Sequence, residues 1–236
     1  MSKNVAHFTT LDHHDSPTPY VFAPSSGTFA GQPVSVYLDA LQERLLQWLS
    51  FQEAVVGCVA WLTNEAVLAA LNEKRICQVV MQKEDWMRPD YDGRHPARSS
   101  RTMYRRLAGF DRPQIAGLSE LSYCGDPSVE GFRCFGQSGD PASRPVMHHK
   151  FLVGCTVTEE PPEEPGCYGR LRLEPQSVWT GSFNMTQGAL RNLDSAVVLG
   201  AEPARLYYGE WVDALSHSEP LDFDSEWCAP QWRMGS

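Results

Sequence analysis

Residues 54–81 read AVVGCVAWLTNEAVLAALNEKRICQVVM. Two apolar runs in this stretch, 54–60 and 76–81, predict buried strands. Between them, Thr63 or Asn64 can cap a helix that runs to about Asn72. Three apolar side chains of that helix are expected to face inward: Val67, Leu68 and Leu71. Strand, helix and strand in this order predict a βαβ unit, whose strands are parallel and whose crossover is right-handed.

The flanking sequence continues this alternation of strands and helices. Helices are expected over 34–51, 185–191 and 203–216. Strands are expected over 131–135, 146–154, 168–173, 176–180 and 195–200, and 114–123 fits either a short helix or a strand edge. Length and composition fit one compact domain, because 236 residues can bury a sizeable core. The organisation we expect is an irregular N-terminal arm (1–32), a catalytic domain (33–218) with an inserted loop (155–177), and a C-terminal tail (219–236).

Two other segments place polar side chains at the ends of apolar strands. The first, 147–153, reads MHHKFLV, and the second, 178–186, reads VWTGSFNMT. On an extended strand His148 and Lys150 point to one face and His149 points to the other. Ser182 and Asn184 share a face in the same way, and Gly181 would let the backbone come close to a ligand. These segments supply an imidazole, an ammonium, a hydroxyl and a carboxamide, which are groups that handle phosphate.

These segments resemble the phospholipase D superfamily, whose signature is His-x-Lys, four residues, Asp, and later Gly-Ser-x-Asn. The signature falls on these residues of the chain: His148, Lys150, Gly181, Ser182 and Asn184. Asp194, in Asn192-Leu193-Asp194, matches a downstream block where the family has an acidic residue. The resemblance implies an α/β fold, namely a mixed, largely parallel sheet with helices on both faces. This chain would be one half-unit of that kind, since His-x-Lys occurs in it once.

The chain departs from the family pattern in two places. Cys155 stands where the signature has Asp, and residues 156–177, rich in Pro and Glu, separate the two motif blocks. Cys155 could be redox-sensitive, but its place at the end of an apolar strand favours a buried filler. If a site group needs an acceptor there, Asp194 or Glu174 would have to supply it.

The resemblance also implies a mechanism without a metal or another cofactor. His148 attacks phosphorus to form a phosphohistidine, and a second imidazole protonates the leaving oxygen. Because one chain has one such histidine, a homodimer with a shared site is expected. Lys150 and Asn184 would stabilise the transition-state charge, with a hydrogen bond from Ser182. Asp194 would accept a hydrogen bond from the far ring nitrogen of His148.

The distribution of charge bears on the substrate. The net charge is −9, yet seven arginines lie between Arg88 and Arg112. Four of them are candidate substrate-binding residues: Arg98, Arg101, Arg105 and Arg106. They favour a nucleic acid backbone as substrate and hence a nuclease acting on DNA or RNA, although a solvated basic helix face over 99–107 is the alternative. Two other functions stay open, a phospholipase D or phosphatidyl transferase acting on lipids, and a silent phosphate-binding module.

Composition also bounds the cellular setting. No run of eighteen apolar residues occurs, and Met1 to Thr10 lacks the pattern of a secretory signal, so we expect no stable membrane insertion. The seven cysteines form no Cys-x-x-Cys pair, which favours reduced thiols over zinc ligands. A cytoplasmic protein is the expectation.

Overall fold

The computed structural model describes residues 25–29, 31–87, 94, 102–104, 107, 110–111, 113, 115, 131–135, 146–162 and 169–221. Within these residues nine strands form one sheet, in the order β1-β2-β8-β7-β6-β3-β4-β5-β9. The pairs β3–β4 and β4–β5 are parallel, and the other neighbours in this order are antiparallel. The α/β class and the mixed sheet are confirmed, but "largely parallel" is wrong. Parallel neighbours need a long crossover, whereas β6–β7 is a hairpin and its connection is short.

The βαβ unit lies where the sequence predicts it. It consists of β3 (Ala54–Val59), α2 (Glu65–Asn72) and β4 (Ile76–Gln82), and its two strands pair in parallel. Asn64 caps α2, because its side-chain oxygen accepts from the backbone N–H of Ala66 at 3.1 Å and of Val67 at 3.2 Å. The three apolar residues expected to face inward from this helix are buried.

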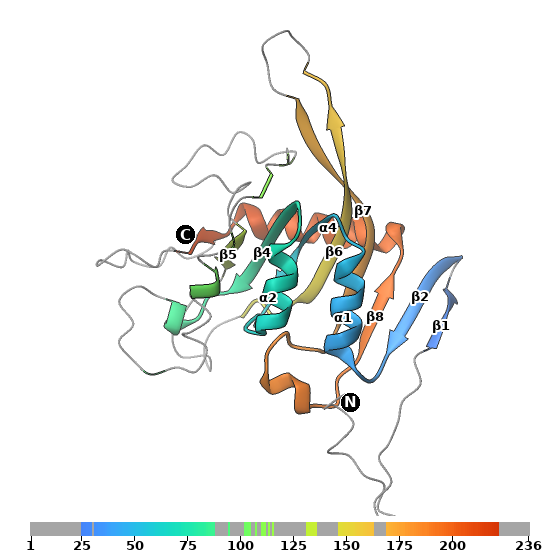
Figure 1. Ribbon diagram of the computed structural model, residues 1–236, viewed down its shortest axis with the longest axis vertical. Helices are drawn as coiled ribbons and strands as arrows, with labels where there is room; N and C mark the ends of the chain where they lie inside the picture. Colours follow the sequence, from blue (N-terminus) through green and yellow to red (C-terminus); the bar gives the residue numbers. More distant parts are fainter. Residues whose placement is uncertain are drawn as a thin grey trace, which may run out of the picture.

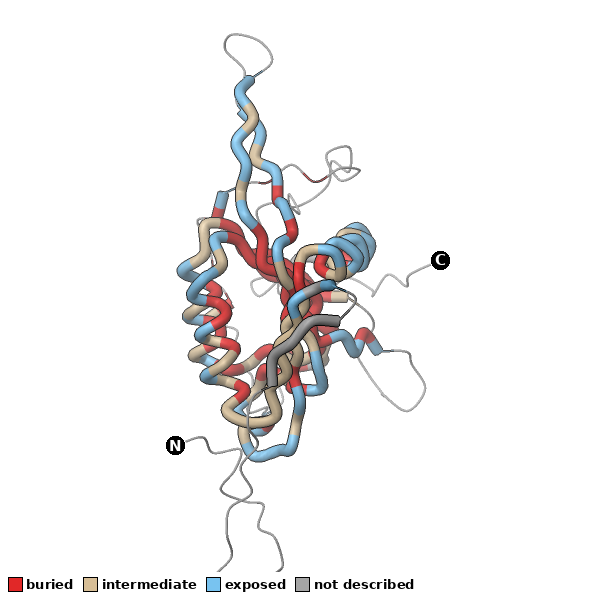
Figure 2. The backbone as a smooth tube through the Cα atoms, turned by 90° about the vertical axis from the view of Figure 1, so that its right-hand side faces the viewer, coloured by how far each residue is buried: buried red, intermediate tan, exposed pale blue. Residues whose placement is uncertain are grey.

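Helices cover both faces of the sheet (Figures 1 and 2). α1 (Leu41–Ser50) and α2 lie on one face, and α4 (Ala201–Ser216) lies on the other. The first face buries Leu152 and Trp179 with these two helices, and the second buries Phe151 and Val153 with Trp211 of α4. Since neighbouring residues of β6 enter opposite cores, a strand here is apolar on both faces.

The start of the described chain differs from the prediction. The expected helix over 34–51 divides into strand β2 (Gln32–Tyr37) and the shorter α1, and β1 (Ser25–Phe29) lies within the segment expected to be an irregular arm. β2 pairs with β8 (Ala196–Leu199), which brings Val34 opposite Leu199. The ladder with a distant strand overrides the helical spacing of the apolar residues in 34–40.

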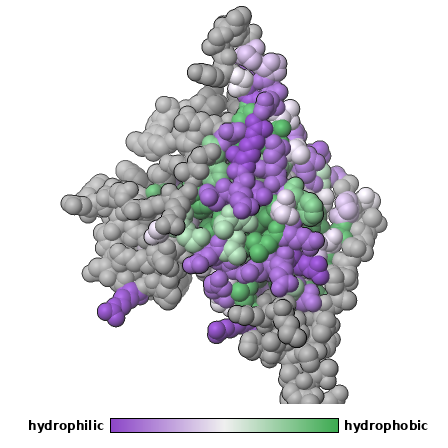
Figure 3. Space-filling view, viewed as in Figure 1, coloured by the Kyte–Doolittle hydropathy of each residue, from purple (hydrophilic) through white to green (hydrophobic). Residues whose placement is uncertain are grey.

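The long strands β6 (Lys150–Glu160) and β7 (Arg170–Gly181) pair as an antiparallel ribbon that extends beyond the body of the molecule (Figure 1). The expected inserted loop over 155–177 is wrong at its start, because residues 155–160 continue β6, and at its end the strands expected over 168–173 and 176–180 form one strand, β7. A register shift between Gly154 and Cys155 leaves Gln176 without an opposite residue and puts Pro175 opposite Cys155. A bulge tolerates proline inside a strand, which is why Pro175 does not end β7. The ribbon surface is hydrophilic (Figure 3).

The remaining elements are short. β5 (Phe132–Phe135) pairs with β4 and with β9 (Glu219–Pro220), so the expected tail begins with a strand. The described residues also form two 3-10 turns, η1 (Asp85–Met87) and η4 (Gly188–Arg191), the second in place of the helix expected over 185–191. In the described part of the chain no helix is both long and apolar enough to cross a membrane.

Candidate active site

Strand pairing brings the two motif segments together at one end of the sheet. Lys150 begins β6 opposite Val59, and Thr180 near the end of β7 lies opposite Phe151. Gly181, the last residue of β7, is opposite Ala196, which begins β8 and follows Asp194 by two residues. The polar groups predicted from sequence thus gather at the end of β6–β7 that lies away from the projecting ribbon tip (Figure 1).

His148 and Lys150 are in direct contact, as their shared strand face predicts. Lys150 Nζ lies 3.0 Å from His148 Nε2 and donates to the His148 carbonyl at 3.1 Å. When the lysine is charged its ammonium can only donate, so Nε2 accepts and the ring proton resides on Nδ1. A lone pair on Nε2 is the form of imidazole that can attack phosphorus.

The surroundings favour this neutral imidazole. The pKa of His148 lies below its ordinary value because partial burial disfavours the charged ring, and the charges of Lys150 and His149 add to the effect. The pKa of Lys150 is also lowered by burial, and the nearby Asp194 carboxylate partly opposes that change. The site therefore keeps an unprotonated nucleophile available near neutral pH.

Lys150 is buried, with 8% of its surface exposed. It forms no ion pair with a described carboxylate, but its ammonium lies 5.5 Å from the centre of the Trp61 ring. A buried cation is costly unless a partner compensates it, and the aromatic face supplies only part of that compensation. The site is thus prepared for an anion that the described side chains do not supply.

Ser182 and Asp194 form a hydrogen-bonded pair at the same end of the sheet. Ser182 Oγ donates to Asp194 Oδ1 at 2.8 Å and accepts from the Ser195 backbone N–H at 3.0 Å. The expected hydrogen bond between Asp194 and His148 is not formed, because this carboxylate oxygen faces Ser182 across the turn into β8. A Cβ on Gly181 would lie 2.1 Å from the Ser195 carbonyl oxygen, so glycine is required there for backbone packing. A contact between Gly181 and substrate stays a prediction.

Asn184 Oδ1 and Asp194 Oδ2 are buried and lack a hydrogen-bond partner among the described residues. Such atoms are uncommon, since an unsatisfied buried acceptor costs about 1–3 kcal/mol. Asn184 is followed by Met185, which bridges to Leu62 and accepts from the Thr63 and Asn64 backbone N–H groups at 2.9 Å. The Gly-Ser-x-Asn loop is therefore fixed against the chain that leaves β3.

His149 and Cys155 both lie apart from the site residues described above. Cys155 stands where the family signature has Asp. His149 Nε2 is 3.2 Å from Glu210 on α4, on the opposite face of the sheet, as the strand alternation predicts. Cys155 is 1% exposed in the core under α4, and burial raises its pKa to about 12. It is a buried filler, as favoured from the sequence. The acceptor for Ser182 is Asp194, whereas Glu174 lies on the ribbon opposite Thr156.

Two further residues at this site, Trp61 and Glu84, were not predicted from the sequence. Trp61 lies two residues after the end of β3, where its ring meets His148 edge to face with centroids 5.1 Å apart. Its indole N–H donates to Glu84 Oε1 at 2.8 Å. Both residues follow the carboxyl ends of the parallel strands β3 and β4, and that position is the signal that could have identified them.

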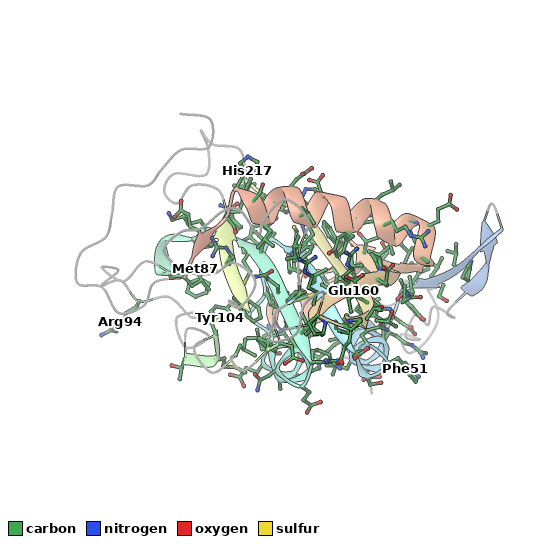
Figure 4. The ribbon with its side chains drawn as sticks, turned by 90° about the horizontal axis from the view of Figure 1, so that it is seen from above. Phe51, Met87, Arg94, Tyr104, Glu160 and His217 are labelled. Carbon is green, nitrogen blue, oxygen red and sulfur yellow. The ribbon has the colours of Figure 1, made fainter. Side chains whose placement is uncertain are left out.

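The arginine cluster falls largely outside the described residues, which exclude Arg98, Arg101, Arg105 and Arg106. Arg94 is exposed and lies well apart from the sheet (Figure 4). Tyr104 is buried, stacks on Phe132 with ring centroids 5.4 Å apart, and donates a hydrogen bond to the Leu62 carbonyl. Through Tyr104, the arginine-rich segment is therefore hydrogen-bonded to Leu62, the residue that follows Trp61. Among the described side chains no group of three His, Cys, Asp or Glu residues is arranged to hold a metal ion.

Comparisons with known proteins were made for the whole chain. No family model matches it. An uncharacterised protein of Acanthamoeba polyphaga mimivirus is 23% identical over 209 residues, which are 80% of this chain and 67% of the viral protein.

Among solved structures, the chain is similar to Nuc, a phospholipase D family member from Salmonella typhimurium, at 16% identity and a TM-score of 0.46, over 84% of this chain and 97% of that one. NucT from Helicobacter pylori is 10% identical with a TM-score of 0.46, over 79% and 98% of the two chains. Phosphatidylserine synthase from Haemophilus influenzae is 10% identical with a TM-score of 0.43, over 80% and 40%. These likenesses are loose. On its motif residues the chain resembles the phospholipase D family.

Proposed function

We propose that this protein is a metal-independent phosphodiesterase, and specifically a nuclease that forms a phosphohistidine at a site shared across a homodimer. The observation that carries the proposal is the contact of 3.0 Å between Lys150 Nζ and His148 Nε2. It holds a neutral nucleophile beside a buried positive charge, which is the pairing that attack on an anionic diester needs.

The described side chains of one copy supply the parts of such a reaction except for the second imidazole. When the diester binds, the Lys150 ammonium donates a hydrogen bond to a diester oxygen and no longer to His148 Nε2. The lone pair of Nε2 is then free to attack phosphorus. As the N–P bond forms, the bond to the leaving oxygen breaks and that oxygen takes a proton from a second imidazole. Water then attacks the phosphohistidine and gives a proton back to the second imidazole, the N–P bond breaks, and His148 is restored. Asn184 donates through its side-chain amide to a non-bridging oxygen as charge develops, and Ser182 adds a hydrogen bond when its hydroxyl turns from Asp194 Oδ1 toward the phosphate.

We expect the second imidazole to come from another copy of the chain, as the resemblance implies. His149 cannot serve, because it lies on the opposite face of the sheet beside Glu210. Two exposed apolar side chains adjoin the motif residues: Val146 at 43% exposure and Leu193 at 50%. An isologous contact made there would cover them and bring His148 of the partner subunit to the same phosphorus.

Nucleic acid is the favoured substrate because of the arginine-rich segment. Tyr104 anchors that segment at Leu62, beside the catalytic end of the sheet. The neighbouring Arg105 and Arg106 would meet backbone phosphates on either side of the cleaved bond. A silent binding module is disfavoured, since the substituted residue Cys155 lies in the core under α4 and does not contact the reacting groups. Val146 and Leu193 equally suit a lipid substrate, so a phosphatidyl transferase is the second candidate.

One activity screen tests these alternatives. Purified protein in EDTA is offered single-stranded and double-stranded DNA, RNA and phosphatidylcholine vesicles, alongside His148→Ala. We expect cleavage of nucleic acid in EDTA that the variant lacks. Cleavage of phosphatidylcholine alone would select the lipid enzyme, and metal-dependent cleavage unaffected by the variant would overturn the proposal.

The shared site has its own test. Sedimentation and activity are measured over the same range of protein concentration, and we expect specific activity to fall as the dimer dissociates. A monomer with full activity contradicts the shared site while leaving the phosphodiesterase proposal in place.

A further inference from the structure

Trp61 lies where the sheet would continue past its last paired residues. Val59 is opposite Lys150, and the Ala60 N–H donates to the His149 carbonyl at 2.7 Å. One step further along this register, Trp61 is opposite His148. Trp61 and His148 therefore share the sheet face on which Val59 and Lys150 lie.

The indole ring contacts both members of the catalytic pair. It meets the His148 ring edge to face, with centroids 5.1 Å apart and planes at 75°. The Lys150 ammonium lies 5.5 Å from the centre of the same ring, within the range of a cation–π contact. One aromatic side chain thus limits where both the imidazole and the ammonium can go.

The indole is itself held in place. Its N–H donates to Glu84 Oε1 at 2.8 Å, and Glu84 follows β4, the strand parallel to β3. Two chain segments that leave adjacent parallel strands are therefore joined directly behind His148. A ring anchored at its nitrogen cannot rotate away without losing that hydrogen bond.

This support matters because no described carboxylate orients His148. Asp194, the residue expected to do so, is bonded to Ser182 through Oδ1. Histidines that act in catalysis need a partner that fixes ring orientation and tautomer. Among the described residues, the contacts that orient the ring come from Lys150 and Trp61.

We propose that Trp61, anchored by Glu84, is a positioning residue that holds the His148 ring and the Lys150 ammonium in the geometry for attack on phosphorus. This inference rests on the proposed phosphodiesterase function and deepens it. It assigns a role to two residues outside the His-x-Lys and Gly-Ser-x-Asn motifs.

The kinetic test compares Trp61→Ala, Trp61→Phe and Glu84→Ala on the diester that the wild type cleaves. Trp61→Ala should lower kcat by about 10- to 100-fold, since a small misplacement of a reacting group has effects of this size, with little change in KM. Trp61→Phe keeps an aromatic face and should recover most of the loss. Glu84→Ala should fall between the wild type and Trp61→Ala, because the ring stays but its anchor is removed.

A second measurement does not depend on activity. The proton NMR signals of the imidazole rings are titrated in the wild type and in the three variants, with His148→Gln used to assign the His148 signal. Trp61→Ala should move the pKa of His148 upward toward its ordinary value, because the ring becomes more solvated, and Trp61→Phe should leave it low. Thermal unfolding of each variant confirms that it is folded.

The outcomes separate the two proposals. If the wild type cleaves no diester but the His148 titration shifts in Trp61→Ala and not in Trp61→Phe, the positioning contact stands and the proposed function fails. If the wild type is active and folded Trp61→Ala matches it in kcat and in the His148 titration, the positioning role is overturned. A Glu84→Ala variant equal to the wild type in both readouts overturns the anchor.

Discussion

The two ends of the β6–β7 pair place charged residues in opposite circumstances. At the site end Lys150 is buried without a described carboxylate partner, and Asn184 and Asp194 each keep a buried oxygen unpaired. At the ribbon end the charges are exposed and paired, as in Arg172 with Glu160 at 2.9 Å. Costly polar groups therefore lie on or next to one end of this strand pair, and inexpensive ones lie at the other.

This difference separates charges that matter only for folding from charges that are kept for binding or chemistry. An exposed ion pair contributes about 0–1 kcal/mol, so its loss is easily tolerated. A buried, unpaired ammonium destabilises the fold, and a protein that keeps one needs it for binding or chemistry. Arg75 fits the first description, because three carboxylates surround it at the base of the ribbon: Glu53, Asp111 and Glu159.

The largest expected effect is that of His148→Ala at the site end. It should lower diester cleavage by about 10⁴-fold or more, since the nucleophile is removed. His149→Ala is the matched control, and we expect it to keep activity because its ring faces Glu210 on the other side of the sheet. Initial rates in EDTA measure both. Equal losses of activity in the two variants would contradict the assignment of His148 and His149 to opposite faces of the sheet.

Lys150→Met should separate activity from stability. We expect cleavage to fall by about 10²- to 10³-fold, because one charge that stabilises the transition state is lost. The melting temperature should stay equal or rise. Burial lowers the lysine pKa in the folded state, so at neutral pH the unfolded chain holds the proton more favourably and the charge opposes folding.

The same variant should raise the pKa of His148, because a neighbouring positive charge is removed. NMR titration of the ring checks this. A destabilised Lys150→Met protein would contradict the view that the ammonium is kept for function.

Cys155→Asp restores the residue of the family signature and tests whether its absence matters. Cys155 is 1% exposed, and the hydrogen bond it makes is donated to the Val153 carbonyl, so a carboxylate there would find no ready donor. We expect a loss of about 3 kcal/mol in the free energy of unfolding and no gain in specific activity of the folded fraction. Cys155→Ala is the control, with a cost of about 1 kcal/mol and unchanged cleavage. Denaturant unfolding measures both, and increased activity in Cys155→Asp would overturn the filler role.

The smallest effect is expected at the ribbon end. Glu160→Gln and Arg172→Gln should each change the free energy of unfolding by less than about 1 kcal/mol, because both side chains of the pair are largely exposed. Cleavage should be unchanged. A loss of activity in either variant would show that the ribbon takes part in function and would break the contrast between the two ends.

Much of the local structure could be predicted from the sequence. The βαβ unit, the Asn64 cap and the opposite faces of His148 and His149 follow from periodicity and capping, which depend on residues close in the chain. The Pro- and Glu-rich stretch was wrongly expected to be a loop from 155 onward, because a bulge opposite Cys155 accommodates Pro175 and lets the strand continue. The segment 34–40 was misassigned because its pairing partner β8 is more than 150 residues away.

The sequence by itself determined the reacting groups of this protein: one imidazole and one ammonium on a shared strand face, and one Gly-Ser-x-Asn turn. Only the tertiary structure decided how they are held. Strand order brings Trp61 and Glu84 behind His148. The pairing of β8 with the end of β7 places Asp194 where it accepts a hydrogen bond from Ser182. The physical reason is that alternation along a strand is a local property, whereas the contacts across strands depend on which distant segments pair and in what register.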